Sequence, residues 1–149
     1  MRCTVYTWLL ALGLLYAHSA NAHEYYALGF KLVHPWAEAS APDATQAAVY
    51  FKLENVTGHD RLLRASTPHA QSVELRGAQD GDDSDAAQTA PPLPALDIAP
   101  ADTLEFVRGR PHLLLRGLTV PLQWGRSYMM MMVFERAGPL LVMVSVGAH

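Results

Sequence analysis

The chain has 149 residues, half of them hydrophobic, and a single cysteine. Its 14 acidic and 11 basic side chains give a net charge of −3, which argues against a nucleic-acid partner, since such a partner calls for a basic surface. The length suits one domain behind a leader, and one cysteine excludes a disulfide-stapled fold.

The first 22 residues are typical of a cleavable signal peptide. Arg2 precedes an apolar run over 5–17, and the small residues Ala20 and Ala22 stand where a signal peptidase cuts. The run is about 13 residues long, whereas a membrane-spanning helix needs roughly 20, so a retained anchor is the weaker alternative. We predict a periplasmic protein whose mature chain, residues 23–149, folds as one domain with no membrane span.

Cleavage would remove the only cysteine. Cys3 lies ahead of the apolar run, not at the cleavage point where a lipid-bearing cysteine would stand. The mature chain then has no thiol for a disulfide, a thiolate metal site or a nucleophile. Any binding of a soft metal ion must use histidine or methionine.

Short apolar–polar alternations recur along the mature chain, and no segment keeps a helical stripe for three turns. In 47–55, Val49, Phe51 and Leu53 alternate with Tyr50 and charged residues, which predicts a strand with one face in water. Turn residues separate the candidates, and together they predict an all-β fold, a β-sandwich. The predicted strands are 27–33, 47–55, 61–66, 72–75, 103–107, 112–116, 127–136 and 140–146.

One long segment interrupts the strands. Residues 77–94 hold four aspartates and a Pro-Pro pair but almost nothing large and apolar to bury, so we predict a mobile, acidic surface loop. A hard-cation site is the alternative, but the segment lacks the spaced glycine and closing glutamate of a helix-loop-helix calcium site.

The histidines show no pattern of a known catalytic or zinc site. No His-x-x-x-His or His-Glu-x-x-His spacing, nucleophile elbow or phosphate-cradling glycine loop is found, so we do not predict an enzyme. His112 opens the strand 112–116, where the residue two positions along shares its face, but that neighbour is Leu114. By itself His112 is either a hydrogen-bonded strand-end residue or a metal ligand. The histidines of the mature chain are His23, His34, His59, His69, His112 and His149.

Two further features offer copper chemistry. Thioethers bind Cu(I), but alternation places Met129 and Met131 on one face of a strand and Met130 and Met132 on the other, and we predict that these methionines fill the core. His23 would gain a free α-amino group on cleavage and, with a second imidazole, could hold Cu(II). The alternative for His23 is a frayed, exposed terminus.

Several segments, in order and with suitable spacing, resemble the PCu(A)C family of periplasmic copper chaperones. The resemblance implies a cupredoxin-like β-sandwich that carries Cu(I) and supplies copper to the dinuclear copper site of cytochrome oxidase. The matching segments are His34-Pro35-Trp36-Ala37 with 47–51, Asp60-Arg61-Leu62-Leu63 with 65–68 and 73–75, and 96–98, 111–113 and 117–118 with 121–122 and 134–138.

The resemblance also implies a set of copper ligands, namely a histidine, a methionine farther along and a closing His-x-Met. Carried onto this chain, they fall at Arg76, near 87–89, at His112 and at Leu114. Only His112 is of the expected type, and it is our predicted metal residue. A guanidinium at the first position puts a fixed positive charge where the cation should lie.

Three functions follow from these observations. The first is a periplasmic copper-handling protein that uses a residual site at His112, or a rearranged site that recruits His23, His69 or a methionine, and passes copper to an acceptor such as a cytochrome oxidase subunit. The second is a metal-free binding or assembly module on the same scaffold. The third is a mono-copper enzyme built on the new terminus at His23.

Overall fold

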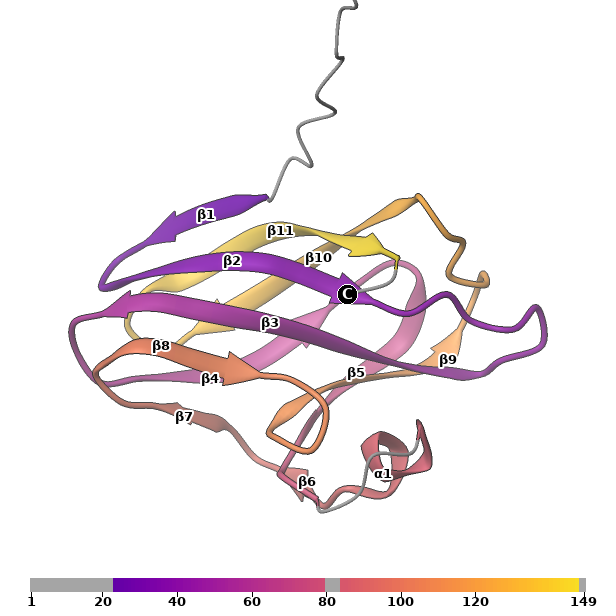
Figure 1. Cartoon of the computed structure of the whole chain (residues 1–149), viewed down its shortest axis with the longest axis horizontal. Coiled ribbons are helices and arrows are strands. Elements are labelled where there is room, and N and C mark those ends of the chain that lie inside the picture. Colours follow the sequence, from indigo (N-terminus) through magenta and orange to yellow (C-terminus); the bar gives the residue numbers. More distant parts are fainter. Residues whose placement is uncertain (1–22, 80–83, 148–149) are drawn as a thin grey trace, which may run out of the picture.

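The computed structural model describes residues 23–79 and 84–147, and within them the chain is almost entirely β-structure (Figure 1). The predicted signal peptide and His149 lie outside the described residues. No helix of the described residues is long and apolar enough to cross a membrane. The elements are β1 (Glu24–Ala27), β2 (Phe30–Ala37), β3 (Gln46–Val56), β4 (Asp60–Ser66), β5 (Ala70–Arg76), α1 (Ser84–Thr89), β6 (Pro92–Leu93), β7 (Leu96–Ile98), β8 (Ala101–Phe106), β9 (His112–Leu118), β10 (Ser127–Phe134) and β11 (Gly138–Val146).

The prediction of an all-β fold is confirmed. Each predicted strand from 47–55 onward coincides with one observed strand, whereas 27–33 spans the β1–β2 turn and the first half of β2. The short strands β6 and β7 were not predicted, because two or three residues are too few to show an alternation.

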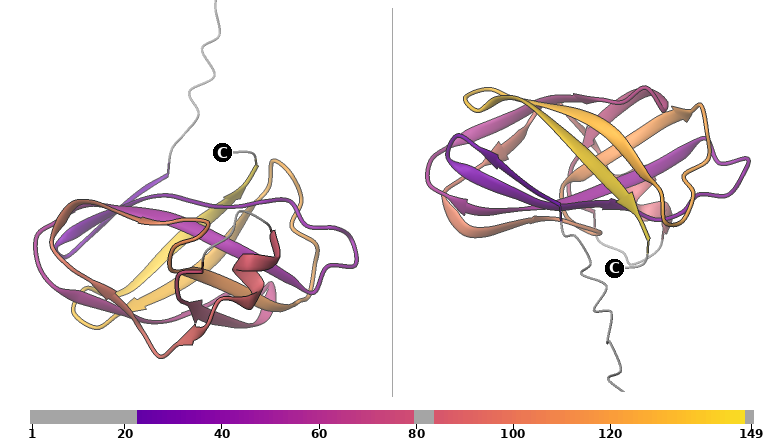
Figure 2. Two further views of the ribbon diagram at one scale, coloured as in Figure 1. Left: turned by 60° about the horizontal axis from the view of Figure 1, so that its bottom comes forward. Right: turned by 90° about the horizontal axis from the view of Figure 1, so that it is seen from above.

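The strands form one hydrogen-bonded sheet in the order β6-β5-β9-β3-β2-β11-β10-β4-β7, with β1 added to β2 and β8 added to β3. Neighbours are antiparallel except β11 and β2, which run parallel. The sheet rolls over so that β2 and β3 lie in front of β10 and β4 (Figure 1), and the view from above shows two layers (Figure 2). The predicted sandwich is therefore a sheet wrapped around one core.

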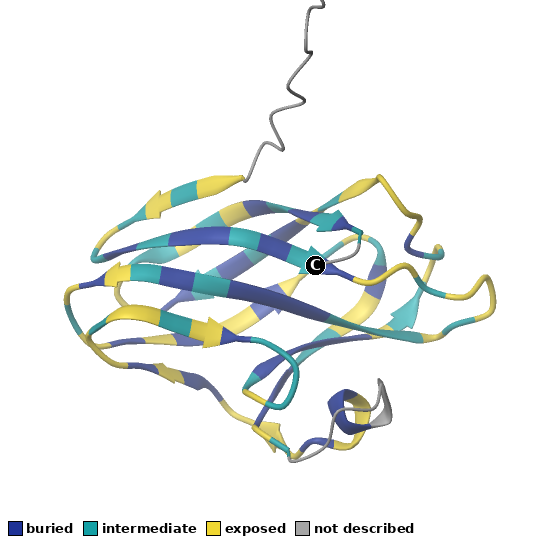
Figure 3. Ribbon diagram, viewed as in Figure 1, coloured by how far each residue is buried: buried dark blue, intermediate teal, exposed yellow. Residues whose placement is uncertain are grey.

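The core fills the space between these layers. Buried and exposed residues alternate along the strands (Figure 3), as expected when one sheet face is apolar. Leu53 of β3 and Met130 and Met132 of β10 are fully buried. The rings of Phe30 and Phe134 meet across the core with centroids 4.8 Å apart. Burial of this apolar surface is the main force that holds the two layers together.

A buried carboxylate fixes the turn between β10 and β11. Asp60 Oδ1 accepts hydrogen bonds from the backbone N–H groups of Arg61 at 2.7 Å and Arg136 at 2.8 Å, and Oδ2 accepts one from Ala137 at 3.0 Å. Hydrogen bonds to a charged acceptor are the stronger kind. The β10–β11 hairpin is therefore attached to the start of β4.

The prediction that residues 77–94 form only a surface loop with almost nothing to bury is wrong. The segment contains α1 and β6, and Ala86, Ala87 and Ala90 are buried. The small methyl groups of these alanines let α1 lie close to β3 and β9. The prediction missed this because it counted only large apolar residues as candidates for burial. The aspartates at 80, 82 and 83 lie outside the described residues.

Tyr50 also departs from the prediction. It lies on the outward face of β3, as the alternation requires, but only 2% of it is exposed. Its ring packs against Trp36 with centroids 4.7 Å apart, and α1 lies over this part of the sheet. The outward face of β3 is therefore partly a second buried surface rather than a wet one.

Candidate functional site

The four positions at which the family resemblance places copper ligands lie together in the fold. Strands β5 and β9 pair so that Arg76 stands directly opposite His112. Leu114 lies two residues along β9 and shares the face of His112. Ala87 of α1 reaches the same face from above, since its carbonyl oxygen contacts His112. The four positions are thus neighbours in the fold, but only His112 carries a side chain of the expected type.

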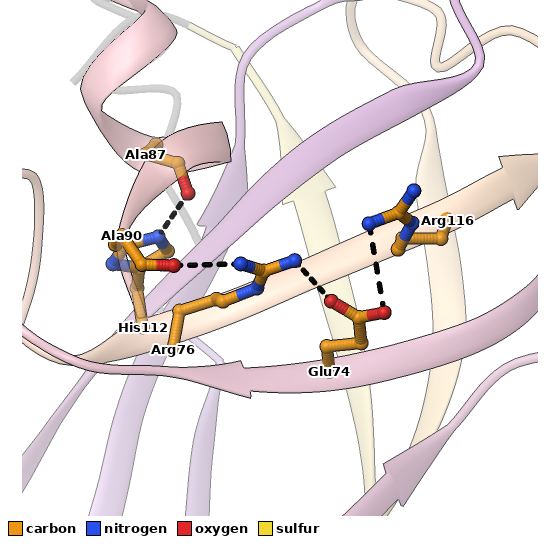
Figure 4. A network of polar contacts seen from close by, with 6 residues as sticks. All are labelled: Glu74, Arg76, Ala87, Ala90, His112 and Arg116. Carbon is orange, nitrogen blue, oxygen red and sulfur yellow. Dashed lines mark hydrogen bonds and ion pairs between the residues drawn. The ribbon is translucent and has the colours of Figure 1, made fainter. Parts of the chain in front are cut away.

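His112 is held by two backbone carbonyl groups. Only 1% of it is exposed, with Nδ1 2.7 Å from the carbonyl oxygen of Arg110 and Nε2 2.8 Å from that of Ala87 (Figure 4 shows the second contact). A carbonyl oxygen only accepts hydrogen bonds, and a neutral imidazole carries one N–H, so at most one of the two contacts is a hydrogen bond of the neutral ring. In either tautomer a carbonyl group lies where a metal ion would approach each ring nitrogen.

Arg76 fills the position where the first histidine is expected. It is 7% exposed, its Nη1 donates to the carbonyl oxygen of Ala90 at 2.6 Å, and its Nη2 pairs with Glu74 (Figure 4). Glu74 also faces Arg116, with 3.6 Å between Oε1 and Nη1. Within the described residues the Nε of Arg76 is buried without an acceptor, a defect that typically costs about 1–3 kcal/mol.

These residues do not fit a Cu(I) ion. Cu(I) favours soft, uncharged donors. This position instead presents the guanidinium of Arg76, the side chains of Ala87 and Leu114, and an imidazole whose two nitrogens both contact carbonyl groups. No cluster of three or more histidine, cysteine or acidic side chains suited to a metal occurs in the described residues. The ligand role of His112 stays a prediction, and a metal would have to displace the Ala87 or Arg110 carbonyl to reach it.

A groove of about 340 Å³ lies beside the buried contacts of Arg76 and His112, which we call the buried network. It is lined by Ala87, Tyr50 and the ion pair between Arg108 and Glu38, whose Nη2 and Oε1 are 2.5 Å apart. Burial raises the pKa of the Tyr50 hydroxyl above its ordinary value of 10.0, and the nearby Arg108 opposes part of this rise. The groove leads past the buried network without exposing His112.

The structure places the backbone of His34 opposite the backbone of His23, at the start of β1. The carbonyl oxygen of His23 accepts a hydrogen bond of 3.1 Å from the backbone N–H of His34, so these two histidines stand opposite each other where β1 begins. His23 is exposed, as predicted for a terminus. The only signal for this pairing is the β1–β2 register, which an isolated histidine does not reveal.

His69 lies elsewhere, at the end of the core. It is half-buried, with its ring edge-on to Tyr128 and the centroids 4.9 Å apart. It lines a cavity of about 10 Å³ together with Met129. His69 is therefore remote from the place where Arg76 of β5 lies opposite His112 of β9, which we call the β5–β9 position. It cannot complete a site with His112 in this fold.

The methionine run divides as the alternation predicts. Met130 and Met132 face the core, where their predicted filling role is confirmed. Met129 is 42% exposed and Met131 is half-buried on the opposite face, so the core-filling prediction is wrong for these two. Sequence reasoning missed Met143, which joins them on that face because β11 pairs with β10.

Comparisons with known proteins agree with this fold. A family model described as lipoprotein LpqE-like matches residues 30–146, and no curated protein matches the chain. The copper-bound PCuAC domain from PmoF2 has a TM-score of 0.70 at 26% identity, covering 85% of this chain and 99% of that one. Cu(I)-DR1885 from Deinococcus radiodurans has a TM-score of 0.59 at 23% identity, covering 87% and 82%. The resemblance to the PCu(A)C family, and its cupredoxin-like fold, are thereby confirmed.

Proposed function

Because the chain belongs to the LpqE-like family and has the fold of PCuAC domains, we propose that it is an exported copper-handling protein, a carrier and not an enzyme. The observation that carries this proposal is the match to the copper-bound PmoF2 domain, which spans nearly the whole of that domain. The family's description as lipoprotein-like supports export. The proposed compartment is the periplasm, and the proposed acceptor is a copper-binding subunit of cytochrome oxidase.

The proposal does not place copper at the β5–β9 position in the described conformation. There the strands are in place but the donors do not fit. Arg76 occupies the space that copper would need, and two backbone carbonyl groups already contact the ring nitrogens of His112. His112 would enter a coordination sphere only after the Arg110 or the Ala87 carbonyl group moves away from its ring nitrogen, and moving Ala87 requires α1 to shift. Copper carriage in the described conformation therefore has to use other donors.

The test is a Cu(I) titration of the chain that begins at His23, without oxygen and against a chromophoric competitor. We expect one Cu(I) per chain, bound more tightly than by a histidine-bearing control protein of similar size. Transfer is then followed by adding the soluble copper domain of an oxidase subunit and recording the absorbance of its dinuclear centre. Binding no tighter than the control would refute the proposal, and binding without transfer would restrict it to storage.

A metal-free binding or assembly module is the second candidate, favoured by one observation. Arg76 lies opposite His112, and its guanidinium is bonded to Ala90 and Glu74 in place of a metal ligand. In that case a strain lacking the gene should be complemented equally well by the wild-type chain and by a variant that binds no copper. Complementation only by copper-binding chains would exclude this candidate.

A further inference from the structure

All methionines of the described residues lie on the β10–β11 hairpin. Two of them, Met130 and Met132, belong to the core. The other three, Met129, Met131 and Met143, lie on the opposite, outward side of the two strands. We call these three residues the thioether face.

The register brings these side chains together. Met129 is directly opposite Met143, and Met131 lies two residues along β10 on the same side. In an antiparallel pair the Cβ atoms of opposed residues are about 4.5–5.5 Å apart, and diagonal neighbours at about 7–8 Å remain within reach of long side chains. Three flexible thioethers can therefore converge on one point above the hairpin.

Packing alone does not explain this face. The outward side of an antiparallel strand pair is normally polar or β-branched. Polar residues border this face on β4, where Ser66 pairs with Met131, and at the end of the hairpin, where Ser127 pairs with Ser145. Met129 exposes 42% of its surface, so it fills no core gap.

The three sulfur atoms differ from the ring nitrogens of His112 in what they already contact. No hydrogen bond of the described residues engages the sulfur of Met129, Met131 or Met143. The backbone beneath them is fixed, since the carbonyl oxygen of Met129 accepts a bond of 2.7 Å from Thr67 and the N–H of Met143 donates one of 2.7 Å to the Tyr25 hydroxyl. Positioned backbone with unengaged sulfur atoms is what a soft-metal site requires.

We propose that Met129, Met131 and Met143 form a Cu(I)-binding site on the outward face of the β10–β11 hairpin, separate from the β5–β9 position. Thioethers are soft, uncharged donors that select Cu(I). They do not titrate, so a proton cannot compete with the metal for them. The inference rests on the proposed copper-handling function and gives the copper a location that the family ligands no longer provide.

The experiment compares three chains that begin at His23. The test variant is Met129→Leu/Met131→Leu/Met143→Leu, which keeps the outward apolar surface and removes only sulfur. The matched control is Met130→Leu/Met132→Leu, which removes the same kind of atom from the core. Cu(I) affinity is measured by competition at pH 7.5 and at pH 5.5.

We expect the test variant to lose at least about 100-fold in Cu(I) affinity, since even outer-shell partners of metal sites are worth about 10- to 100-fold. The control should stay within about twofold of the wild type. Wild-type affinity should hold at pH 5.5, where a site built on histidines of ordinary pKa, about 6.5, weakens by protonation.

A second readout needs no variant. In wild-type protein with carbon-13 in the methionine methyl groups, one equivalent of Cu(I) should shift three methyl signals and leave the two core signals in place. Wild-type binding that the test variant retains, or shifts confined to the core signals, would overturn the thioether face and leave the proposed function intact. Wild-type protein that binds no Cu(I) would overturn both.

Discussion

The β5–β9 position and the thioether face each contain a type of side chain that can bind copper, but the two regions differ in what those side chains already contact. At the first, His112 is 1% exposed and each ring nitrogen faces a carbonyl oxygen. At the second, Met129 is 42% exposed and its sulfur has no hydrogen bond among the described residues. One region keeps the family's place without its chemistry, and the other offers the chemistry in a new place.

The difference shows that residue type and position are not enough to identify a metal site. An imidazole binds a metal through the lone pair of a ring nitrogen, and at His112 a backbone carbonyl oxygen lies within hydrogen-bond distance of each of the two nitrogens. A thioether has no proton to gain and few competing partners, so exposure leaves it available. Adding or removing donor side chains in one region, with the other region as the reference, shows which of the two binds copper.

The largest effect should come from rebuilding the family ligands. We introduce Arg76→His and Leu114→Met into the variant that lacks the thioether face, so that any binding reports the β5–β9 position. The register places residue 76 opposite His112, a spacing suited to two ligands of one ion. We expect Cu(I) affinity to rise by about 100-fold over the same background.

The matched control for the rebuilt site is Arg76→Leu with Leu114→Met, which removes the guanidinium without adding an imidazole. It should leave Cu(I) affinity low. An equal gain in both chains would mean that the charge of Arg76, and not the missing donor, keeps copper away.

Removing the ring of His112 should chiefly affect folding. His112→Ala deletes a buried side chain and leaves the carbonyl groups of Ala87 and Arg110 without their partner, which should cost about 3 kcal/mol of the free energy of unfolding. Urea unfolding measures this. His59→Ala, at an exposed histidine, is the control and should change stability by less than about 0.5 kcal/mol.

The same His112→Ala chain also tests the predicted ligand role. If copper is held on the thioether face, Cu(I) affinity should stay within about twofold of the wild type under conditions where the variant is folded. A large loss of affinity in a folded variant would restore His112 as the ligand and show that α1 opens to admit the metal.

The sequence alone predicted which side chains of the two regions share a face of their strand. The alternation in 127–136 separated Met130 and Met132 from Met129 and Met131, and the spacing of His112 and Leu114 placed them on one face, because both facts are local to a strand. The pairing of Met129 with Met143 was not predictable, since it depends on which strands become neighbours.

Burial of the β5–β9 position was equally hidden from the sequence. Its cover is a helix whose buried face consists of alanines, and composition gives such a segment the character of a loop. His112 contacts backbone carbonyl groups. Because every residue has such a group, no pattern of side chains in the sequence predicts these contacts. The family resemblance pointed to positions that are neighbours in the fold, but it could not show that carbonyl groups already contact both ring nitrogens of His112.

The smallest expected effect concerns Tyr50, which lines the groove beside the buried network. Burial raises the pKa of Tyr50, so the fold favours its neutral form. The stability that this contributes is present below the ordinary value of 10.0 and is lost as the pH rises through the higher value in the folded protein. Urea unfolding from pH 8 to pH 11 should therefore show a steeper decline for the wild type than for Tyr50→Phe. Parallel declines would mean that the space under α1 admits water, which would weaken the argument that His112 is closed to a metal.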